Sequence, residues 1–404
     1  MKAPDKFYFV LISFFLLQVT SAYGCQLHWD RFETGLSDNI NAPRCPLGQL
    51  NDTGITVCSS ITIVEGECPM EGYADQDAES GRDFLYISGH LNKLGGGVAG
   101  FDFTKLDTSG NVLPPDAESW ECVRDNHTGL IWEVKSNDPA HPRYAGLTYL
   151  KYQLGDLTTH ANDIELCGFS DWRIPEAIEL LQIVHNGKRT INKIDSDYFP
   201  FNNNAYYTNT SVAGESARSW IVAFVSGYTA TWFNTNSAYA RLVRSDKANK
   251  QSASKQDEQV ELDTSKKRFL GSSDNGTVEH SPTGLMWSKC LLGQIWEDEE
   301  CVGEPENAIW ADALIAVQSF GVGGYSDWRI PSKNELASLV DWENFNPSIN
   351  IDVFPGTPSG YFWTSSPAIW ATPGYAWAVD FSDGRVMFQG MNFEFLVRPV
   401  RDIR

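Results

Sequence analysis

The chain has 404 residues, and its 52 acidic and 31 basic residues give a formal net charge of −21. This charge opposes electrostatic attraction to nucleic acid or to anionic lipid headgroups, so we expect neither as a partner. The length allows two or three domains, and the 14 tryptophans can supply both packed cores and surfaces that stack on sugar rings.

The first 24 residues have the pattern of a secretory signal peptide. Lys2 and Lys6 precede an apolar run over residues 7–19, and small and polar residues follow as far as Gly24. The run is shorter than the roughly 20 apolar residues that a membrane span needs. No second long apolar run follows, so we expect no transmembrane segment in the mature chain. The chain is then secreted, or located in the periplasm or outer envelope.

The signal peptide has two possible cleavage positions. Cleavage after Ala22 gives a secreted chain, whereas cleavage after Gly24 makes Cys25 the first residue and allows a lipid anchor there. The bulky Tyr23, and the absence of a Leu three residues before Cys25, favour secretion.

Eight cysteines in an exported chain, none of them in a CxxC motif, indicate disulfides rather than zinc or redox sites. Proximity along the chain predicts the pairs Cys58–Cys68 and Cys290–Cys301. Cys122 and Cys167 bracket the first half of repeat one and would join its entry strand to the segment before the repeated motif, which leaves the pair Cys25–Cys45. The even count agrees with a Cys25 that is disulfide-bonded and not lipidated.

Residues 25–119 are predicted to form a disulfide-containing N-terminal extension that packs on the domain after it. Its strand-like runs are short, such as residues 61–64. Residues 95–100 match the GxGxxG spacing of dinucleotide-binding loops, but turn residues follow them where such a site needs a helix. We therefore interpret this segment as a flexible loop.

The rest of the chain contains the same domain twice. Thr-Gly-Leu-Ile-Trp at 128–132 returns as Thr-Gly-Leu-Met-Trp at 283–287, and Ser-Asp-Trp-Arg-Ile-Pro at 170–175 returns at 326–331. Each copy closes on a basic apolar strand, at 241–244 and 398–401. The predicted boundaries are 120–244 for the first repeat domain, 245–268 for a solvated linker and 269–404 for the second repeat domain.

Within each repeat the pattern predicts a strand, a helix, the repeated motif, a second helix and several antiparallel strands, which is an α+β domain. Apolar residues at helical spacing predict the first helix of the second repeat over 307–320. The sequence is helix-like after each motif proline, Pro175 and Pro331, and Pro331 fits the first turn of the second helix, where a missing N–H costs nothing.

The repeated motif is interpreted as a structural corner between a strand and a helix. In each copy the Trp (Trp172 or Trp328) and the Ile two residues after it would lie on one face of an extended segment. The guanidinium of Arg173 or Arg329 would then point the other way and bond a carboxylate or carbonyl oxygens. Asp171 and Asp327 are turn residues that can hold their own backbone. Nothing beside the motif supplies a nucleophile or a base, so a catalytic role is disfavoured.

These motifs together resemble the domain of unknown function 1566 family, which is also named after the C-terminal domain of the Legionella collagen-like adhesin. The resemblance covers nearly all of the mature chain. It implies two tandem C-type-lectin-like domains, each with two helices and a small twisted antiparallel sheet whose loops carry ligands. The Arg-Ile-Pro corner is also similar to a corner of formylglycine-generating enzymes, which belong to the same fold group.

The resemblance implies an exported, non-catalytic binding or adhesion module of the bacterial cell envelope, with a glycan or a cell-surface protein as partner. Residues 270–404 contain 7 basic and 18 acidic residues, a balance that disfavours sulfated polymers. One alternative is a structural envelope protein without a ligand. Another is an oxidoreductase of the formylglycine-generating type, which would need reactive cysteines after the motif, where neither copy has one.

Two loops of the second repeat are candidate sites. Trp370 and Tyr375 stand near Gly and Pro residues and are candidates for stacking on sugar rings, whereas Trp363 and Trp377 are expected in the core. Six carboxylates between 297 and 306 could bind Ca²⁺, but they lack the spacing of a defined calcium loop, so a solvated acidic loop is favoured. No other cofactor or metal is expected.

Overall fold

The computed structural model of the protein describes residues 49–202, 204–246, 269–270, 275–280, 283–370 and 372–403. The predicted signal peptide (1–24), the Cys25–Cys45 pair, the lipid-anchor alternative and nearly all of the linker lie outside the described residues. Residues 47–404 form one compact unit, which contains both repeats.

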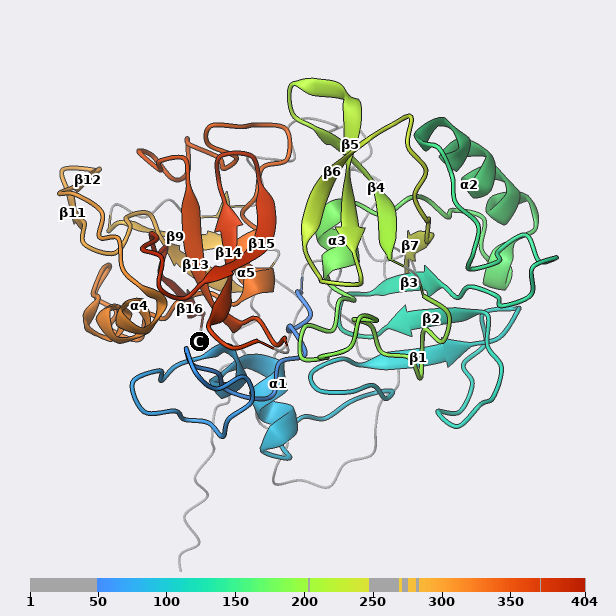
Figure 1. Ribbon diagram of the computed structural model, residues 1–404, viewed down its shortest axis with the longest axis horizontal. Coiled ribbons are helices and arrows are strands. Elements are labelled where there is room, and N and C mark those ends of the chain that lie inside the picture. The colour runs from blue at the N-terminus through green and yellow to red at the C-terminus, as the bar shows by residue number, and fades with distance from the viewer. Residues whose placement is uncertain are drawn as a thin grey trace, which may run out of the picture. The chain divides into compact units, whose positions relative to one another are not determined.

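Repeat one, residues 120–244, contributes to two antiparallel sheets (Figure 1). The first has the order β1-β2-β3-β7 and the second the order β4-β5-β6. The strands are β1 (Phe103–Leu106), β2 (Cys122–Asp125), β3 (Leu130–Glu133), β4 (Ala205–Val212), β5 (Glu215–Ala223), β6 (Thr229–Phe233) and β7 (Val243–Ser245). The helices are α2 (Leu154–Asp163) and α3 (Ala177–Leu181), with short 3-10 turns at Lys151–Gln153 and Leu166–Gly168.

Repeat two, residues 269–404, has the same plan. One sheet has the order β16-β10-β9-β8 and another the order β13-β14-β15. The strands are β8 (Phe269–Leu270), β9 (Thr277–His280), β10 (Leu285–Ser288), β13 (Tyr361–Pro367), β14 (Tyr375–Asp380), β15 (Arg385–Gly390) and β16 (Val400–Asp402). The helices are α4 (Trp310–Ala316) and α5 (Lys333–Ala337), and a 3-10 turn at Val317–Ser319 extends α4.

Repeat two also carries a hairpin that has no counterpart in the described part of repeat one. Its strands are β11 (Ile295–Glu297) and β12 (Glu300–Val302), and its turn contains Asp298 and Glu299. The prediction of two tandem α+β domains is therefore confirmed.

The helix after each motif differs from the sequence prediction in where it begins. The first residue of α3 is Ala177 and that of α5 is Lys333, so Pro175 and Pro331 lie before the N-cap residues Glu176 and Ser332. The predicted placement of Pro331 in the first helical turn was wrong. Proline keeps the backbone of the residue before it out of the helical conformation. The residue after it, Glu176 or Ser332, is also extended because it is the N-cap residue, so the helix begins only after that residue.

The N-terminal extension contacts both repeats, which is more than the sequence predicted. Its strand β1 pairs with β2 of repeat one. Its short helices, a 3-10 turn at Asp77–Glu79 and α1 (Gly81–Ile87), bring the carboxylate of Asp77 to Ser366 of repeat two, whose Oγ donates to it at 2.6 Å. Residues 61–64, predicted as strand-like, form bends.

The hydrophobic core is continuous across the two repeats. One cluster of buried side chains contains Trp132 and Leu180 from repeat one together with Leu336 and Trp377 from repeat two. Two further clusters lie almost wholly within a single repeat each. The repeats therefore share apolar surface that each would otherwise expose to water, and removing such surface from water is the main stabilising term in folding.

Direct contacts join the two three-stranded sheets, which stand next to each other in Figure 1. The rings of Trp220 on β5 and Trp342 after α5 meet edge to face, with centroids 5.0 Å apart. The backbone N–H of Val386 on β15 donates to Thr229 Oγ1 on β6 at 2.9 Å.

Three disulfides join the described cysteines in the pairs expected from the sequence, Cys58–Cys68, Cys122–Cys167 and Cys290–Cys301. Within the described residues, no helix is both long enough and apolar enough to cross a membrane.

Candidate binding site

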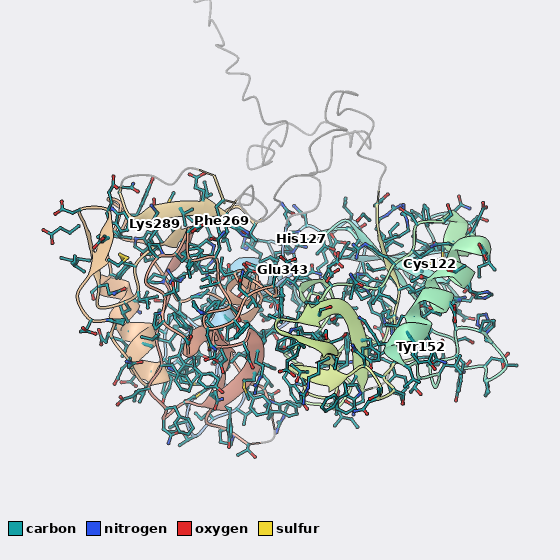
Figure 2. All side chains as sticks on the ribbon, turned by 90° about the horizontal axis from the view of Figure 1, so that it is seen from above. Cys122, His127, Tyr152, Phe269, Lys289 and Glu343 are labelled. Carbon is teal, nitrogen blue, oxygen red and sulfur yellow. A yellow bond between two sulfur atoms is a disulfide. The ribbon has the colours of Figure 1, made fainter. Side chains whose placement is uncertain are left out.

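A pocket of about 730 Å³ lies between the repeats, and we call it the inter-repeat pocket. Repeat one contributes residues of α3 and the end of β4, and repeat two contributes the segment 337–343 after α5. Phe269 and Glu343, both labelled in Figure 2, are part of its wall. Gln49 and Leu50 of the extension complete it.

The wall from repeat one is held by its own hydrogen bonds. Glu176, the N-cap residue of α3, accepts from Asn209 Nδ2 at 2.8 Å and from Thr210 Oγ1 at 2.6 Å. These bonds connect the start of α3 to β4, so the two elements that form this wall are fixed to each other.

The wall from repeat two is a loop organised by Asp341. The Asp341 carboxylate accepts from the backbone N–H of Glu343 at 3.1 Å and from Asn344 Nδ2 at 2.8 Å. This turn holds Trp342 against Trp220 and leaves the Glu343 side chain exposed at the pocket.

The pocket is acidic. Four carboxylate side chains are among its lining residues (Glu176, Glu179, Asp341 and Glu343), and no lysine or arginine lines it in the part of the chain that the structure describes. Arg173, behind the wall, neutralises Glu179. The charge that remains favours neutral or cationic ligands over anionic ones.

One buried polar group at the pocket has no partner. Gln182 lines the pocket and is 4% exposed. Its Oε1 accepts from the backbone N–H of Asn51 at 2.7 Å, but its Nε2 has no hydrogen-bond partner among the described residues. The Nε2 atom is itself covered by protein, so it is not accessible to a ligand from the pocket.

The repeated motif positions the pocket wall. In repeat one, Arg173 Nη1 and Nη2 donate to the two carboxylate oxygens of Glu179 at 2.7 and 2.6 Å. Glu179 also accepts from the backbone N–H of Glu176 at 2.8 Å, so one carboxylate both receives the motif arginine and caps α3.

The same motif is also joined to the last strand of repeat one. Asp171 Oδ1 accepts from Arg244 Nε at 2.6 Å, and Arg173 exchanges backbone hydrogen bonds with Val243. Trp172 is buried and donates from Nε1 to the Leu166 carbonyl at 2.9 Å.

Repeat two reproduces this geometry. Arg329 donates to both carboxylate oxygens of Glu335 at 2.7 Å, and Asp327 accepts from Arg401 Nε at 2.7 Å. Trp328 is buried as well. The motif therefore makes the same ion pairs in both copies.

The comparison with known families agrees with these two copies. A family model described as the Lcl C-terminal domain matches residues 121–244 and again residues 276–401. Together the two matches cover more than half of the chain. The chain belongs to the Lcl C-terminal domain family. A comparison with curated proteins gave no match.

The two predicted ligand residues of the second Lcl domain lie away from the inter-repeat pocket. Trp370 is half-buried, with its ring centroid 5.4 Å from that of Phe388 and 4.5 Å from Lys193 Nζ. Tyr375 is 38% exposed at the start of β14. Tyr375 thus exposes a larger fraction of its own surface than Trp370 does. Trp363 and Trp377 are buried.

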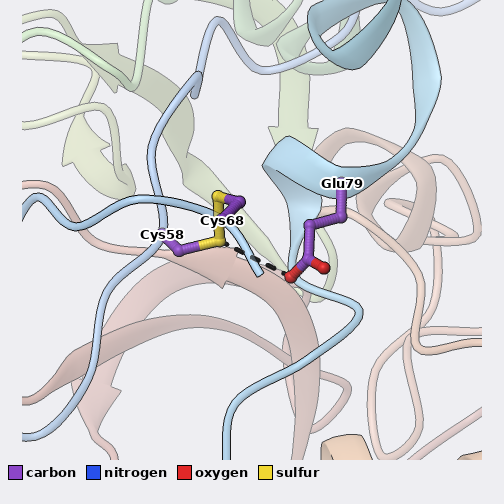
Figure 3. A group of neighbouring side chains, drawn as sticks. All are labelled: Cys58, Cys68 and Glu79. Carbon is purple, nitrogen blue, oxygen red and sulfur yellow. Dashed lines mark hydrogen bonds between the residues drawn. A yellow bond between two sulfur atoms is a disulfide. The ribbon is translucent and has the colours of Figure 1, made fainter. Parts of the chain in front are cut away.

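The acidic loop of the second Lcl domain is exposed, and no cluster of ligand atoms forms there among the described residues. Among the described residues, the possible metal-ligand atoms of Cys58, Cys68 and Glu79 lie within 4.8 Å of one another (Figure 3). Both sulfurs are in a disulfide, so they offer no thiolate to a metal ion. Calcium binding at 297–306 stays a prediction.

A buried polar junction connects the extension to both Lcl domains. Asp77 Oδ2 accepts from Thr53 Oγ1 and from Ser366 Oγ, both at 2.6 Å. Lys333 Nζ donates to Asn186 Oδ1 at 3.2 Å and lies 4.9 Å from the centroid of the Trp377 ring. None of these residues lines the inter-repeat pocket.

Burial shifts the protonation of both charged groups in this junction. Loss of solvent and the nearby Asp52 carboxylate raise the pKa of Asp77 to about 8, and loss of solvent lowers the pKa of Lys333 to about 7. The two groups can therefore both be neutral near pH 7. Because their side chains join three parts of the chain, we interpret the junction as structural.

Sequence reasoning missed the inter-repeat pocket. Its walls come from segments that are far apart in the chain, and only the packing of one repeat on the other brings them together. The available signal was that the helix after each motif carries a conspicuous set of acidic and amide residues, such as Glu176, Glu179 and Gln182.

Proposed function

We propose that the protein is an exported, non-catalytic binding module of the bacterial cell envelope, built from two C-type-lectin-like domains that share one ligand site. The observation that carries the proposal is the inter-repeat pocket. Its volume lies within the range of about 300–1,000 Å³ that is usual for small-ligand sites. Membership of the Lcl C-terminal domain family supports a role in adhesion.

The chemistry of the pocket supports a carbohydrate as ligand. Hydroxyl and amide side chains such as Thr210, Ser211, Ser338 and Asn350 can exchange hydrogen bonds with sugar hydroxyls, and Trp342 offers an aromatic surface. The acidic lining weighs against sulfated or phosphorylated polymers.

A non-catalytic role is supported by the cysteines. A formylglycine-generating type of oxidase needs reactive thiols, whereas all six cysteines in the described ranges are in disulfides. The buried Asp77 and Lys333, whose pKa values are shifted, lie in the polar junction, and neither lines the pocket.

A glycan array tests the proposal. The exported chain should bind a defined set of glycans, and Ala213→Trp, which adds a bulky ring at the pocket, should abolish that binding. Ala217→Trp is the matched control, because Ala217 is exposed on β5 and does not line the pocket. Repeating the array with and without Ca²⁺ tests the acidic loop separately. If the array shows no binding under either condition, the protein is a structural envelope component without a glycan ligand.

A further inference from the structure

We propose that the side chains of Lys333 and Asn186 react to form a covalent amide bond, which cross-links the two repeats. The Lys333 amine attacks the side-chain carbonyl carbon of Asn186 and forms a new C–N bond. The bond from that carbon to Nδ2 breaks, one proton passes from the amine to the departing nitrogen, and ammonia leaves. The reaction needs no oxidant and no co-reactant, and it is independent of any ligand of the inter-repeat pocket.

The two groups are already in contact in the polar junction. Lys333 Nζ lies 3.2 Å from Asn186 Oδ1, the oxygen atom bonded to the carbon that is attacked. The Asn186 amide is held in place, because its Nδ2 donates to the Val184 carbonyl at 3.1 Å and to the Thr53 carbonyl at 3.3 Å. Groups that are held this close together react far faster than the same groups free in solution.

Solvent is excluded from both side chains. Lys333 and Asn186 are each 0% exposed, and Lys333 Nζ lies over the Trp377 ring at 4.9 Å from its centroid. Exclusion of water suppresses hydrolysis of the amide, which is the competing reaction. Loss of solvent also favours the uncharged form of the amine, which is the nucleophile.

The charge state of the junction makes that uncharged amine available. Loss of solvent lowers the pKa of Lys333 to about 7, and the nearby Lys193 adds to this shift while Asp77 opposes it. Loss of solvent also raises the pKa of Asp77 to about 8, so near neutral pH its carboxyl group is largely protonated and does not hold the lysine as an ammonium ion. A substantial fraction of Lys333 is therefore free amine at pH 7.

The bond joins two segments that are far apart in the chain. Lys333 is the first residue of α5 in repeat two, and Asn186 follows α3 in repeat one, 147 positions earlier. Repeat one has Ala177 at the position of Lys333, so the reacting lysine is particular to the second copy. A cross-link that closes so long a loop restricts the unfolded chain and keeps the repeats together.

Mass spectrometry of the denatured protein, after reduction of its disulfides, tests the inference. We expect the wild-type mass to be smaller than the mass calculated from the sequence by one ammonia molecule. A protease digest should also contain a branched peptide in which Lys333 and Asn186 are joined.

Variants locate the loss of ammonia. Lys333→Met and Asn186→Ala should each have the full calculated mass, because one reacting group is missing. Lys193→Met is the matched control, because Lys193 is a second buried lysine whose Nζ donates to the backbone carbonyls of Lys188 and Ile369. It should lose ammonia as the wild type does. Thermal melts verify that each variant is folded.

A wild-type chain with the full calculated mass would overturn the inference and leave the contact as a hydrogen bond. A loss of ammonia that persists in Lys333→Met, or that comes without the branched peptide, would overturn it as well. Gly187 follows Asn186, and its backbone nitrogen can attack the same carbon to give a cyclic imide, which has the same mass loss without a cross-link. None of these results changes the outcome of the glycan array.

Discussion

The arginine of each motif copy forms a two-pronged ion pair with the glutamate that caps the next helix. Arg329 and Glu335 are both largely buried, with side chains 19% and 16% exposed. Burial lowers the ability of water to screen the pair, so removing one partner leaves the other charge without compensation. The carboxylate also keeps the pKa of Arg329 above its usual value.

Arg329→Ala should therefore destabilise the protein by about 3 kcal/mol, because it leaves the Glu335 carboxylate unpaired. Thermal melting followed by circular dichroism measures the loss. Neither Arg329 nor Glu335 lines the inter-repeat pocket, so ligand affinity of the folded variant should not change. A loss of affinity at unchanged melting temperature would instead assign the motif to the binding site.

Asp77 makes stability depend on pH. Its pKa is raised from 3.8 to about 8 in the folded state, so its contribution to stability is complete below about pH 4 and is lost as pH rises toward 8. The pKa values of Asp52 and Asp125 are raised to about 6 by burial and act in the same direction. Lys333 acts in the opposite direction, but between about pH 7 and 10.5.

Two histidines oppose these carboxylates between pH 7 and pH 5, because burial lowers the pKa of His127 and that of His185 to about 3 and the stability that they contribute is lost as pH falls below about 6.5. The contribution of Asp77 is therefore measured against the wild type: Asp77→Asn, which cannot ionise but still accepts hydrogen bonds, should raise the melting temperature at pH 7 more than at pH 5. Asp116→Asn, at an exposed turn, is the control and should leave the pH profile as it is. An unchanged profile for Asp77→Asn would show that Asp77 is ionised in the folded protein at pH 7.

At the scale of elements, the helix after the motif is short and depends on its cap. In α5, Ser332 Oγ accepts from the backbone N–H of Glu335, and Glu335 Oε2 accepts from the backbone N–H of Ser332 at 2.7 Å. Since the helix has only five residues, these reciprocal bonds account for a large share of its own hydrogen bonds.

Ser332→Ala should cost about 1 kcal/mol of stability through loss of this cap. Denaturant unfolding measures the cost. Ser319→Ala serves as a control, because Ser319 is an exposed residue at the end of the 3-10 turn after α4 and should change stability little. A loss for Ser332→Ala no larger than that for the control would contradict the capping role.

The sequence predicted those elements that depend on local pattern or on the repeat itself. The α+β order, the first helix of repeat two and the burial of Trp363 and Trp377 follow from periodicity and from comparing the copies. The pairing of Asp171 with Arg244 could not be read in the same way, because the two residues are 73 positions apart. Such a contact depends on how the last strand returns to the motif.

At the scale of the whole molecule, the sequence treats the repeats as separate domains, whereas the structure gives them a common core. Trp132 of repeat one and Trp377 of repeat two belong to one buried cluster. The extension bonds to both repeats, because the Thr53 carbonyl accepts from the backbone N–H of Asn186 in repeat one and Asp77 accepts from Ser366 in repeat two. Two identical motifs predict two domains, but they carry no information on which faces of the copies meet. The inter-repeat pocket is a consequence of that meeting.

Differential scanning calorimetry of the protein tests most directly whether the two repeats form one body that can share one site. The continuous core predicts a single unfolding transition, and Arg173→Ala in repeat one and Arg329→Ala in repeat two should each move that whole transition to lower temperature. Two separate transitions, with each variant moving only the transition of its own repeat, would contradict the account.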